Sequence, residues 1–373
     1  HDGCKAPGTY TMTLPLSVLF QYIFKRFSIA ILSVFAIVAG LVFVLDLIEL
    51  TRIANDASTN AMLLAAELAF MRTPSVAEQV LPFAALFGAL FAFLSLARSR
   101  ELVVARAGGM SVWHMITAPL IAALLVGAAG TWALNPVSAL LKSKADAIMA
   151  RSTADDQATK PKNIWLRQKN VDGEAIIRAD LADLESGDFR GMTVFEFDLS
   201  GQFIHRVEAP TGHLNEGLWL LRNAKVLSPG TAPERHDIYE LATYLTRDQV
   251  KQSLSEPDTI SVYDLPGWAR ATSAAGLDAT RYIQQFQSLM ARPLVLAAMV
   301  LIAATVSLRF ARTGSHPLSI LSGIGGGFAF YVFAKIAGDF GANGLLNPIL
   351  ASFLPPLSAG LLCTLVLLYL EDG

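Results

Sequence analysis

Apolar residues form two blocks along the chain, and a more polar stretch separates them. Each block contains three runs close to the roughly 20 apolar residues that cross a bilayer. They cover residues 28–50, 79–97 and 112–134 in the first block and 286–308, 318–336 and 348–370 in the second. The stretch from 135 to 281 has no such run. The pattern therefore predicts six membrane-spanning helices and one large domain inserted between the third and the fourth.

The inserted stretch alternates between polar and apolar residues, which is typical of β-strands. Strand-like segments lie at 163–167, 174–179, 193–198, 203–208 and 218–221, with turn signals such as Ser200-Gly201 between them. Helical patterns at 139–151, 265–275 and 278–290 flank these segments. Several short strands at this spacing favour a sandwich or a jelly roll. We therefore predict an α-helical membrane protein with an inserted, all-β, jelly-roll-like domain.

This organisation divides the chain into four parts. Residues 1–27 form a tail and a lead-in, and 28–134 hold spans one to three with a short connecting helix at 99–109. Residues 135–281 form the β domain with its flanking helices, and 282–373 hold spans four to six. The first run is too long for the apolar region of a signal peptide, so we expect it to be a retained span. Residues 1–11 precede Met12 and are expected to lie upstream of the functional chain.

Basic residues in the short loops predict the orientation. Lys and Arg are enriched in cytoplasmic loops. The chain places Lys25 and Arg26 before span one, Arg98, Arg100 and Arg106 between spans two and three, and Arg309 and Arg312 between spans four and five. We therefore expect both termini in the cytoplasm and the β domain outside. Charged residues make up only 16% of the chain, against about 25% in soluble proteins. The net charge of −2 indicates no class of partner.

The loop after span two is the most distinctive local feature. Glu101 lies among three arginines, and Leu102 is apolar on a segment expected outside the membrane. Gly108-Gly109 ends the predicted short helix. Two interpretations stay open: an interfacial turn that only satisfies the charge rule, and a docking helix for a cytoplasmic partner.

Charged residues near the outer end of span one and glycines in span five form a second candidate region. Charges within a span are costly and often functional, although a solvated helix end explains them equally well. Small residues permit close helix packing, and the alternative is a helix edge that separates easily. The residues concerned are Asp46, Glu49 and Arg52 in span one, and Gly323, Gly325, Gly326 and Gly327 in span five.

Several kinds of chemistry have no signal in the chain. Histidines do not show metal-ligand spacing, and neither HExxH nor GxSxG occurs. The phosphate-binding GxxxxGK[ST] loop is also missing, so the chain has no motif of its own for ATP. We therefore expect no catalytic residue, no metal site and no nucleic-acid partner.

Three segments resemble the lipopolysaccharide export permease family, LptF/LptG, also called YjgP/YjgQ. The residues 85–90 and 100–111 are similar to that family's second span and coupling segment, and 322–333 are similar to its fifth span. Tyr282 and Pro293 at the entry to span four also fit. The Glu-Leu-Val-Val sequence after Arg100 resembles the LptG branch more than the LptF branch. The layout of three spans, an outer jelly roll and three spans matches over nearly the whole chain.

The resemblance implies a permease subunit of an ABC transporter that extracts lipopolysaccharide from the inner membrane. It implies pairing with an LptF-like subunit, ATP and Mg²⁺ bound by a separate LptB-like ATPase dimer, and delivery to an LptC/LptA-like periplasmic bridge. The residues implied in coupling are Glu101, Leu102, Arg98, Arg100 and Arg106. Those expected at the substrate gate are Asp46, Glu49, Arg52, Gly323, Gly327, Phe328 and Tyr331. The family carries lysines along the outer half of span one, whereas the corresponding stretch here, residues 43–52, has only Arg52 as a basic residue.

The β domain is expected to shelter acyl chains, because burying one CH₂ group is worth about 0.8 kcal/mol. The residues chosen for this path are Ile176, Val194, Phe195, Phe197 and Ile204. The main alternative is a membrane-anchored scaffold whose β domain binds partners without transport. A secondary transporter is less favoured, since the sequence shows no clear repeat.

Overall fold

The computed structural model describes residues 14–53, 61–99, 101, 111–152, 162–170, 173–183, 186–215, 217–243, 250, 256–274, 278–313 and 317–372. The chain divides into two compact units. One comprises His1–Leu134, Ser288–Gly338 and Leu350–Gly373, and the other comprises Asn135–Gln287 and Asp339–Ile349. Each unit is considered by itself below.

Six long apolar helices confirm the predicted number of spans. They are α1 (Leu14–Ile53), α2 (Ala61–Arg98), α4 (Val112–Ala129), α8 (Thr280–Thr313), α9 (Pro317–Ala342) and α10 (Pro348–Asp372). A single π-helical turn, η2 (Gly130–Leu134), follows α4. A helix satisfies its own backbone hydrogen bonds, which hydrocarbon cannot do. Helix α2 begins well before the predicted run at residue 79, because Glu67, Arg72 and Glu78 interrupt the apolar pattern without ending the helix.

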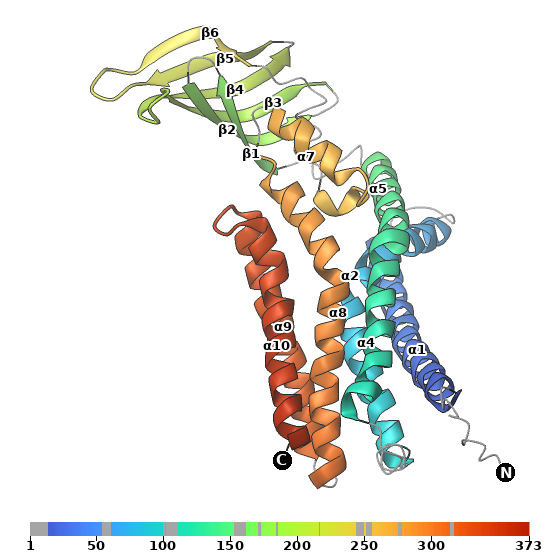
Figure 1. Ribbon diagram of the computed structural model, residues 1–373. Helices are drawn as coiled ribbons and strands as arrows, with labels where there is room; N and C mark the ends of the chain where they lie inside the picture. The colour runs from blue at the N-terminus through green and yellow to red at the C-terminus, as the bar shows by residue number, and fades with distance from the viewer. Residues whose placement is uncertain are drawn as a thin grey trace, which may run out of the picture. The chain divides into compact units, whose positions relative to one another are not determined.

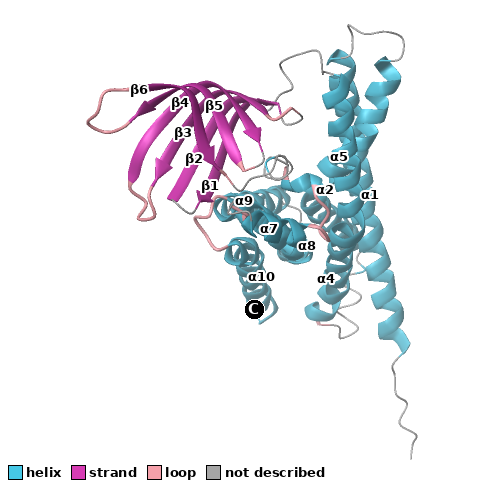
Figure 2. Cartoon of the chain, turned by 90° about the horizontal axis from the view of Figure 1, so that it is seen from above, coloured by secondary structure: helices cyan, strands magenta, loops and turns pink. Residues whose placement is uncertain are grey.

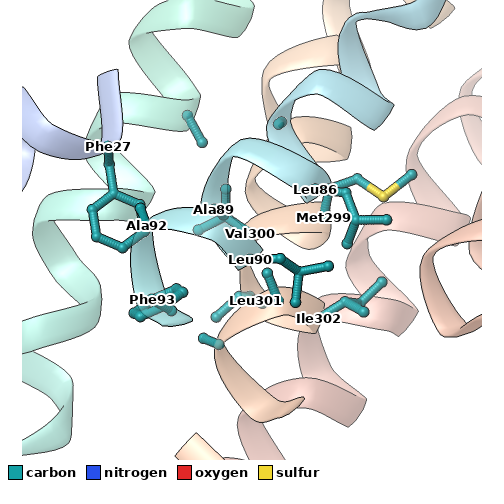
Figure 3. Packing of buried hydrophobic residues seen from close by; sticks show 14 of the residues in the cluster. Phe27, Leu86, Ala89, Leu90, Ala92, Phe93, Met299, Val300, Leu301 and Ile302 are labelled. Carbon is teal, nitrogen blue, oxygen red and sulfur yellow. The ribbon is translucent and has the colours of Figure 1, made fainter. Parts of the chain in front are cut away.

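Helices α2 and α8 lie at the centre of the first unit, and α1 lies at its periphery. In the most apolar 18-residue stretch of each helix, 61% of the residues of α2 and 56% of those of α8 are buried. The corresponding fraction is 6% in α1 and 22% in both α9 and α10. Figure 3 shows side chains of α2, such as Leu90 and Phe93, packed with Leu301 and Ile302 of α8. The outer faces of α1, α9 and α10 are thus left to lipid or to another protein.

Two glycines allow helix backbones to touch within this unit. A Cβ atom at Gly127 of α4 would lie 2.6 Å from the Cα atom of Pro293 in α8. A Cβ atom at Gly88 of α2 would lie 2.7 Å from the Cα atom of Ile31 in α1. Small residues permit such close approach in membrane proteins. The two contacts fix where α4 meets α8 and where α1 meets α2.

The second unit contains helices and one sheet. Helix α5 (Asn135–Ser152) and helix α7 (Leu265–Ala274) coincide with two predicted helices, and the third, at 278–290, is the beginning of α8. Lys142 of α5 binds Glu256 at 2.9 Å and Asp258 at 2.5 Å, beside the short helix η4 (Pro257–Thr259). These ion pairs hold α5 against the segment that follows the sheet.

The sheet has six antiparallel strands in sequence order, as Figure 1 shows. The strands are β1 (Lys162–Asn170), β2 (Gly173–Asp183), β3 (Asp188–Phe197), β4 (Phe203–Asn215), β5 (Leu218–Leu227) and β6 (Glu234–Ala242). The inserted β domain is therefore confirmed. A jelly roll combines two sheets through Greek-key connections, whereas the described strands form one meander. Short turns join the strands, so each strand pairs with its neighbour in sequence.

The sheet is strongly curved, as Figure 2 shows. Its two edge strands are linked at one end through Gln168 of β1, whose side chain donates to the Ala242 carbonyl of β6 at 3.2 Å. Thr243 in turn donates to the Gln168 amide oxygen at 2.7 Å. The core face of the sheet carries the fully buried Trp219, packed edge-on against Phe189 with ring centroids 4.8 Å apart, and Val250, which follows the last strand, belongs to the same core.

One line across the sheet reverses the usual alternation of side chains. Two consecutive residues turn away from the core at 180–181, 190–191, 210–211 and 222–223, on four neighbouring strands. Gly191 and Asn223 lie on this line with φ of 64° and 52°, a left-handed conformation that glycine and asparagine tolerate best. The strands bend together at this line, which accounts for part of the curvature.

Candidate functional site

A polar cluster joins α1 to the end of α2. The Arg26 guanidinium of α1 donates to both carboxylate oxygens of Glu101, at 3.2 and 3.1 Å. Its other terminal nitrogen donates to the Ser95 hydroxyl of α2 at 2.8 Å. The Tyr22 hydroxyl, one turn earlier in α1, donates to Glu101 at 3.1 Å. Both contacts to the carboxylate come from the same guanidinium nitrogen, Nη1, and the hydrogen bond from Tyr22 adds a second donor, so the carboxylate is held from two side chains of α1.

The cluster also stabilises the charge on Glu101. The Ser99 hydroxyl contributes most, and hydrogen bonds from Arg26 and Tyr22 add to it, so the pKa of Glu101 lies below its ordinary value. The Glu101 side chain is still 40% exposed and that of Arg26 is 26% exposed. An ionised carboxylate is therefore held in place and remains accessible to a partner.

An apolar groove of about 500 Å³ opens between α1 and α2 beside this cluster. Ile29 and Ile37 of α1 and Phe91 of α2 form its walls, and Arg26 and Ser95 lie at its end. The two helices are thus incompletely packed on this side.

Only part of the predicted coupling segment lies within the described residues. Arg98 is exposed at the end of α2, and Glu101 makes the contacts above. Arg100, Leu102 and Arg106 lie outside the described residues, so the predicted helix at 99–109 stays a prediction.

A second ion pair, which the sequence reasoning missed, lies in the interior of the first unit. Glu78 of α2 pairs with Arg292 of α8, and their side chains are 6% and 16% exposed. Arg292 precedes Pro293, the residue that Gly127 of α4 touches. Charged residues in membrane helices are expensive and usually paired. The sequence contained the signal, because Arg292 interrupts the apolar run at 286–308.

The charged candidates on α1 lie near its end. Glu49 and Arg52 are exposed, and Asp46 is half-buried. Within the part of the chain that the structure describes, the Oδ2 atom of Asp46 has no hydrogen-bond partner. The three residues are not brought into one cluster.

The candidates on α9 divide between two faces. Gly323 packs against Val306 of α8 and Gly327 against Leu86 of α2, within the same chain. Tyr331 also faces inward, with its ring centroid 4.6 Å from that of Phe83. Phe328 is 58% exposed, and a Cβ atom at Gly325 would meet nothing within 4 Å. The exposed face of α9 is therefore the one around Gly325 and Phe328.

The five candidates on the sheet do not share a face. Val194 is fully buried in the core, whereas its neighbour Phe195 is only half-buried and pairs with Ile176 across β2 and β3. Phe197 contacts the ring of Phe203 at 5.8 Å, and Ile204 is exposed. Successive residues of a strand point to opposite faces, so a consecutive apolar pair cannot line one path.

No cluster of three or more His, Cys, Asp or Glu side chains suited to a metal ion occurs among the described residues.

The family model of the lipopolysaccharide export system permease LptF/LptG matches residues 21–370. The chain belongs to this family. Lipopolysaccharide export system permease protein LptG of Escherichia coli is 26% identical over 358 residues, covering 92% of this chain and 96% of that protein. The LptG protein of Haemophilus influenzae is 23% identical over 356 residues, with the same coverage of both chains.

Membership of the LptF/LptG family gives the fold a role. The chain is a permease subunit in lipopolysaccharide transport, and the similarity to LptG proteins agrees with the prediction from the Glu-Leu-Val-Val segment. Family membership implies a transport subunit and not an enzyme. With six apolar helices, it is a multi-pass inner-membrane protein.

Proposed function

We propose that this permease extracts lipopolysaccharide from the inner membrane, powered by a separate LptB-like ATPase dimer that binds ATP and Mg²⁺. The chain itself holds no cofactor. It pairs with an LptF-like subunit and delivers the lipid to an LptC/LptA-like periplasmic bridge. Both termini lie in the cytoplasm and the β domain lies in the periplasm, as the basic loops favour.

The observation that carries this proposal is the Glu101 cluster at the end of α2. An ionised, partly exposed carboxylate held by Arg26 and Tyr22 offers a partner a fixed negative charge. The ATPase binds there through a basic side chain. Losing one member of a hydrogen-bonded charge pair at an interface costs on the order of 2–5 kcal/mol.

Glu101→Lys tests the ATPase contact. We expect the variant to insert into the membrane normally and to lose co-purification with the ATPase. Glu67→Lys is the matched control, because Glu67 is an exposed acid near the start of α2, far along the chain from Glu101. Normal ATPase association by Glu101→Lys would overturn the docking role. Absence of any ATPase from the purified wild-type complex would favour the scaffold alternative.

The exposed face of α9 supports a gate shared with the LptF-like subunit. Phe328 points away from its own chain, whereas Tyr331 packs on Phe83. We expect cysteine at Phe328 to crosslink to the first span of the partner subunit and to block lipid loading. Cysteine at Tyr331 is the inward-facing control. Crosslinks from both positions solely within this chain, with unimpaired transport, would move the gate elsewhere.

Arg52 is proposed to meet the anionic head group of the lipid at the outer end of α1. It is exposed there, beside the acidic Glu49. Arg52→Glu is expected to weaken binding of lipopolysaccharide, whereas Lys25→Glu, at an exposed position near the other end of α1, is not. Equal lipid binding by wild type and Arg52→Glu would show that Arg52 does not bind the head group.

The core face of the sheet, which carries the buried apolar residues, is the surface that best suits acyl chains. Its residues are apolar and sheltered, and Val226 is a half-buried member at which substitution is tolerable. A photocrosslinker at Val226 is expected to capture lipid during ATP turnover, and one at Phe195, on the opposite face, is not. Capture at Phe195 alone would reverse the assignment of faces.

A further inference from the structure

Helix α1 is packed most closely at one end. Three of its buried residues, Ile23, Phe27 and Ile31, form one stripe at four-residue spacing. From residue 32 to residue 49 no side chain of α1 is buried, and the next buried residue is Leu50. The helix is therefore held firmly by its first turns.

The firmest contact of this docked stripe is with α2. Phe27 packs edge-on against Phe93, with ring centroids 4.6 Å apart. Ile31 meets α2 at Gly88, where a Cβ atom would lie 2.7 Å from the Ile31 Cα atom. Backbone contact at this point leaves little room for sliding, so the contact acts as a pivot.

Arg26 lies on the short side of this pivot. At 1.5 Å per residue, it is about 7.5 Å along the helix from Ile31, and the far end of α1 at Ile53 is about 33 Å away on the other side. A rigid helix that turns about Ile31 thus moves at its far end by about four times the displacement at Arg26. The Arg26–Glu101 contact therefore lies where a small displacement produces a larger one at the far end of α1.

We propose that Arg26 is the positioning residue that transmits movement of the coupling segment to α1. This inference rests on the proposed function, in which an ATPase acts on Glu101. Displacing Glu101 draws Arg26 with it, because the Nη1 atom of Arg26 contacts both carboxylate oxygens. The long arm of α1, which carries Asp46, Glu49 and Arg52, then swings open. The groove beside Arg26 leaves α1 and α2 incompletely packed where this movement begins.

The nature of the side chain matters in this arrangement. Arginine presents a planar fork that matches a carboxylate, whereas lysine is a single point charge. Arg26 uses one terminal nitrogen for Glu101 and the other for Ser95, whereas lysine at position 26 would retain the attraction to Glu101 with a single nitrogen and lose the second contact. Neighbouring Lys25 is exposed and makes no salt bridge within the part of the chain described, so it provides a control of equal charge at the same depth.

The test compares Arg26→Gln, Arg26→Lys and Lys25→Gln in the full complex with its LptF-like and LptB-like partners, reconstituted in liposomes. The measured quantity is labelled lipopolysaccharide transferred per ATP hydrolysed. We expect Arg26→Gln to lower this ratio by about 5-fold or more, the lower end of typical coupling factors. Arg26→Lys is expected to give an intermediate ratio, and Lys25→Gln the wild-type ratio.

Spin labels at Leu45 of α1 and Met62 of α2, both exposed, report the movement itself. We expect an ATP-dependent change in their separation in the wild type and none in Arg26→Gln. A wild-type ratio and a wild-type distance change in Arg26→Gln would overturn this role of Arg26. A wild-type complex that neither binds the ATPase nor transfers lipid would instead overturn the proposed function, so the two failures are distinguishable.

Discussion

Two ion pairs lie in α2 or just beyond its end, and they differ in the exposure of their side chains and in what surrounds them. Glu78–Arg292 joins α2 to α8 between side chains that are 6% and 16% exposed. Arg26–Glu101 joins α1 to a residue just beyond the end of α2, between side chains that are 26% and 40% exposed. The first lies where three helices pack, and the second lies at the rim of a groove.

The difference indicates which contacts hold the permease together and which transmit movement. A buried pair is expensive to break, so α2 and α8 behave as one block. A partly exposed pair such as Arg26–Glu101 contributes little to stability, so its two side chains can move with their helices without destabilising the fold. The predictions below test this division, beginning with the largest expected effect.

Glu78→Gln is expected to destabilise the protein by about 3–5 kcal/mol, because it leaves the Arg292 charge buried without its partner. The measurement is the free energy of unfolding in detergent. The double variant Glu78→Gln with Arg292→Gln removes both charges and should recover much of the loss. If the single and the double variants were equally unstable, the pairing of charges would not be the cause.

Gly127→Ala is expected to cost about 1–3 kcal/mol, since the new methyl group would collide with the backbone at Pro293. Gly325→Ala is the matched control on α9, where nothing lies within 4 Å. The midpoint of thermal unfolding of both variants provides the comparison. Similar midpoints would show that α4 and α8 can move apart enough to accommodate the methyl group without loss of stability.

Arg26→Gln is expected to change the free energy of unfolding by no more than about 1 kcal/mol, the usual range for a partly exposed pair. Lys25→Gln is expected to have an equally small effect. A loss of stability as large as that of Glu78→Gln would mean that the fold depends on Arg26. Its effect on transport would then follow from destabilisation and not from transmitted movement.

The sequence predicted the six helices because each apolar run is long enough to span a bilayer. It also predicted an inserted β domain from alternation. It did not predict the number of sheets, because alternation shows which face of a strand is apolar and not which strands pair. For the same reason the chosen pair of Val194 and Phe195 fell on opposite faces.

The two ion pairs show why contacts between distant residues escape a single sequence. Arg26 was noticed only as a cation before span one, and its partner lies 75 residues away. Glu78 and Arg292 are separated by 214 residues. An arginine within an apolar run signals that a partner exists, but only the packing of α2 on α8 identifies it as Glu78.

The smallest effect is expected from pH. The pKa of Glu101 is depressed in the folded protein, through Ser99 first and through Arg26 and Tyr22. A depressed carboxylate pKa means that the folded state favours the ionised form, so its contribution is complete above the ordinary glutamate pKa and is lost only as pH falls through the lower, folded value. Lipid transferred per ATP should therefore not change through Glu101 between neutral pH and pH 5.

In Arg26→Gln the carboxylate of Glu101 loses one of its stabilising partners, so its pKa should rise toward the ordinary value. Carboxyl ¹³C NMR of labelled glutamate in wild type and Arg26→Gln measures both values, with Lys25→Gln as the control. An unchanged Glu101 pKa in Arg26→Gln would show that the two side chains are not in contact in the working protein.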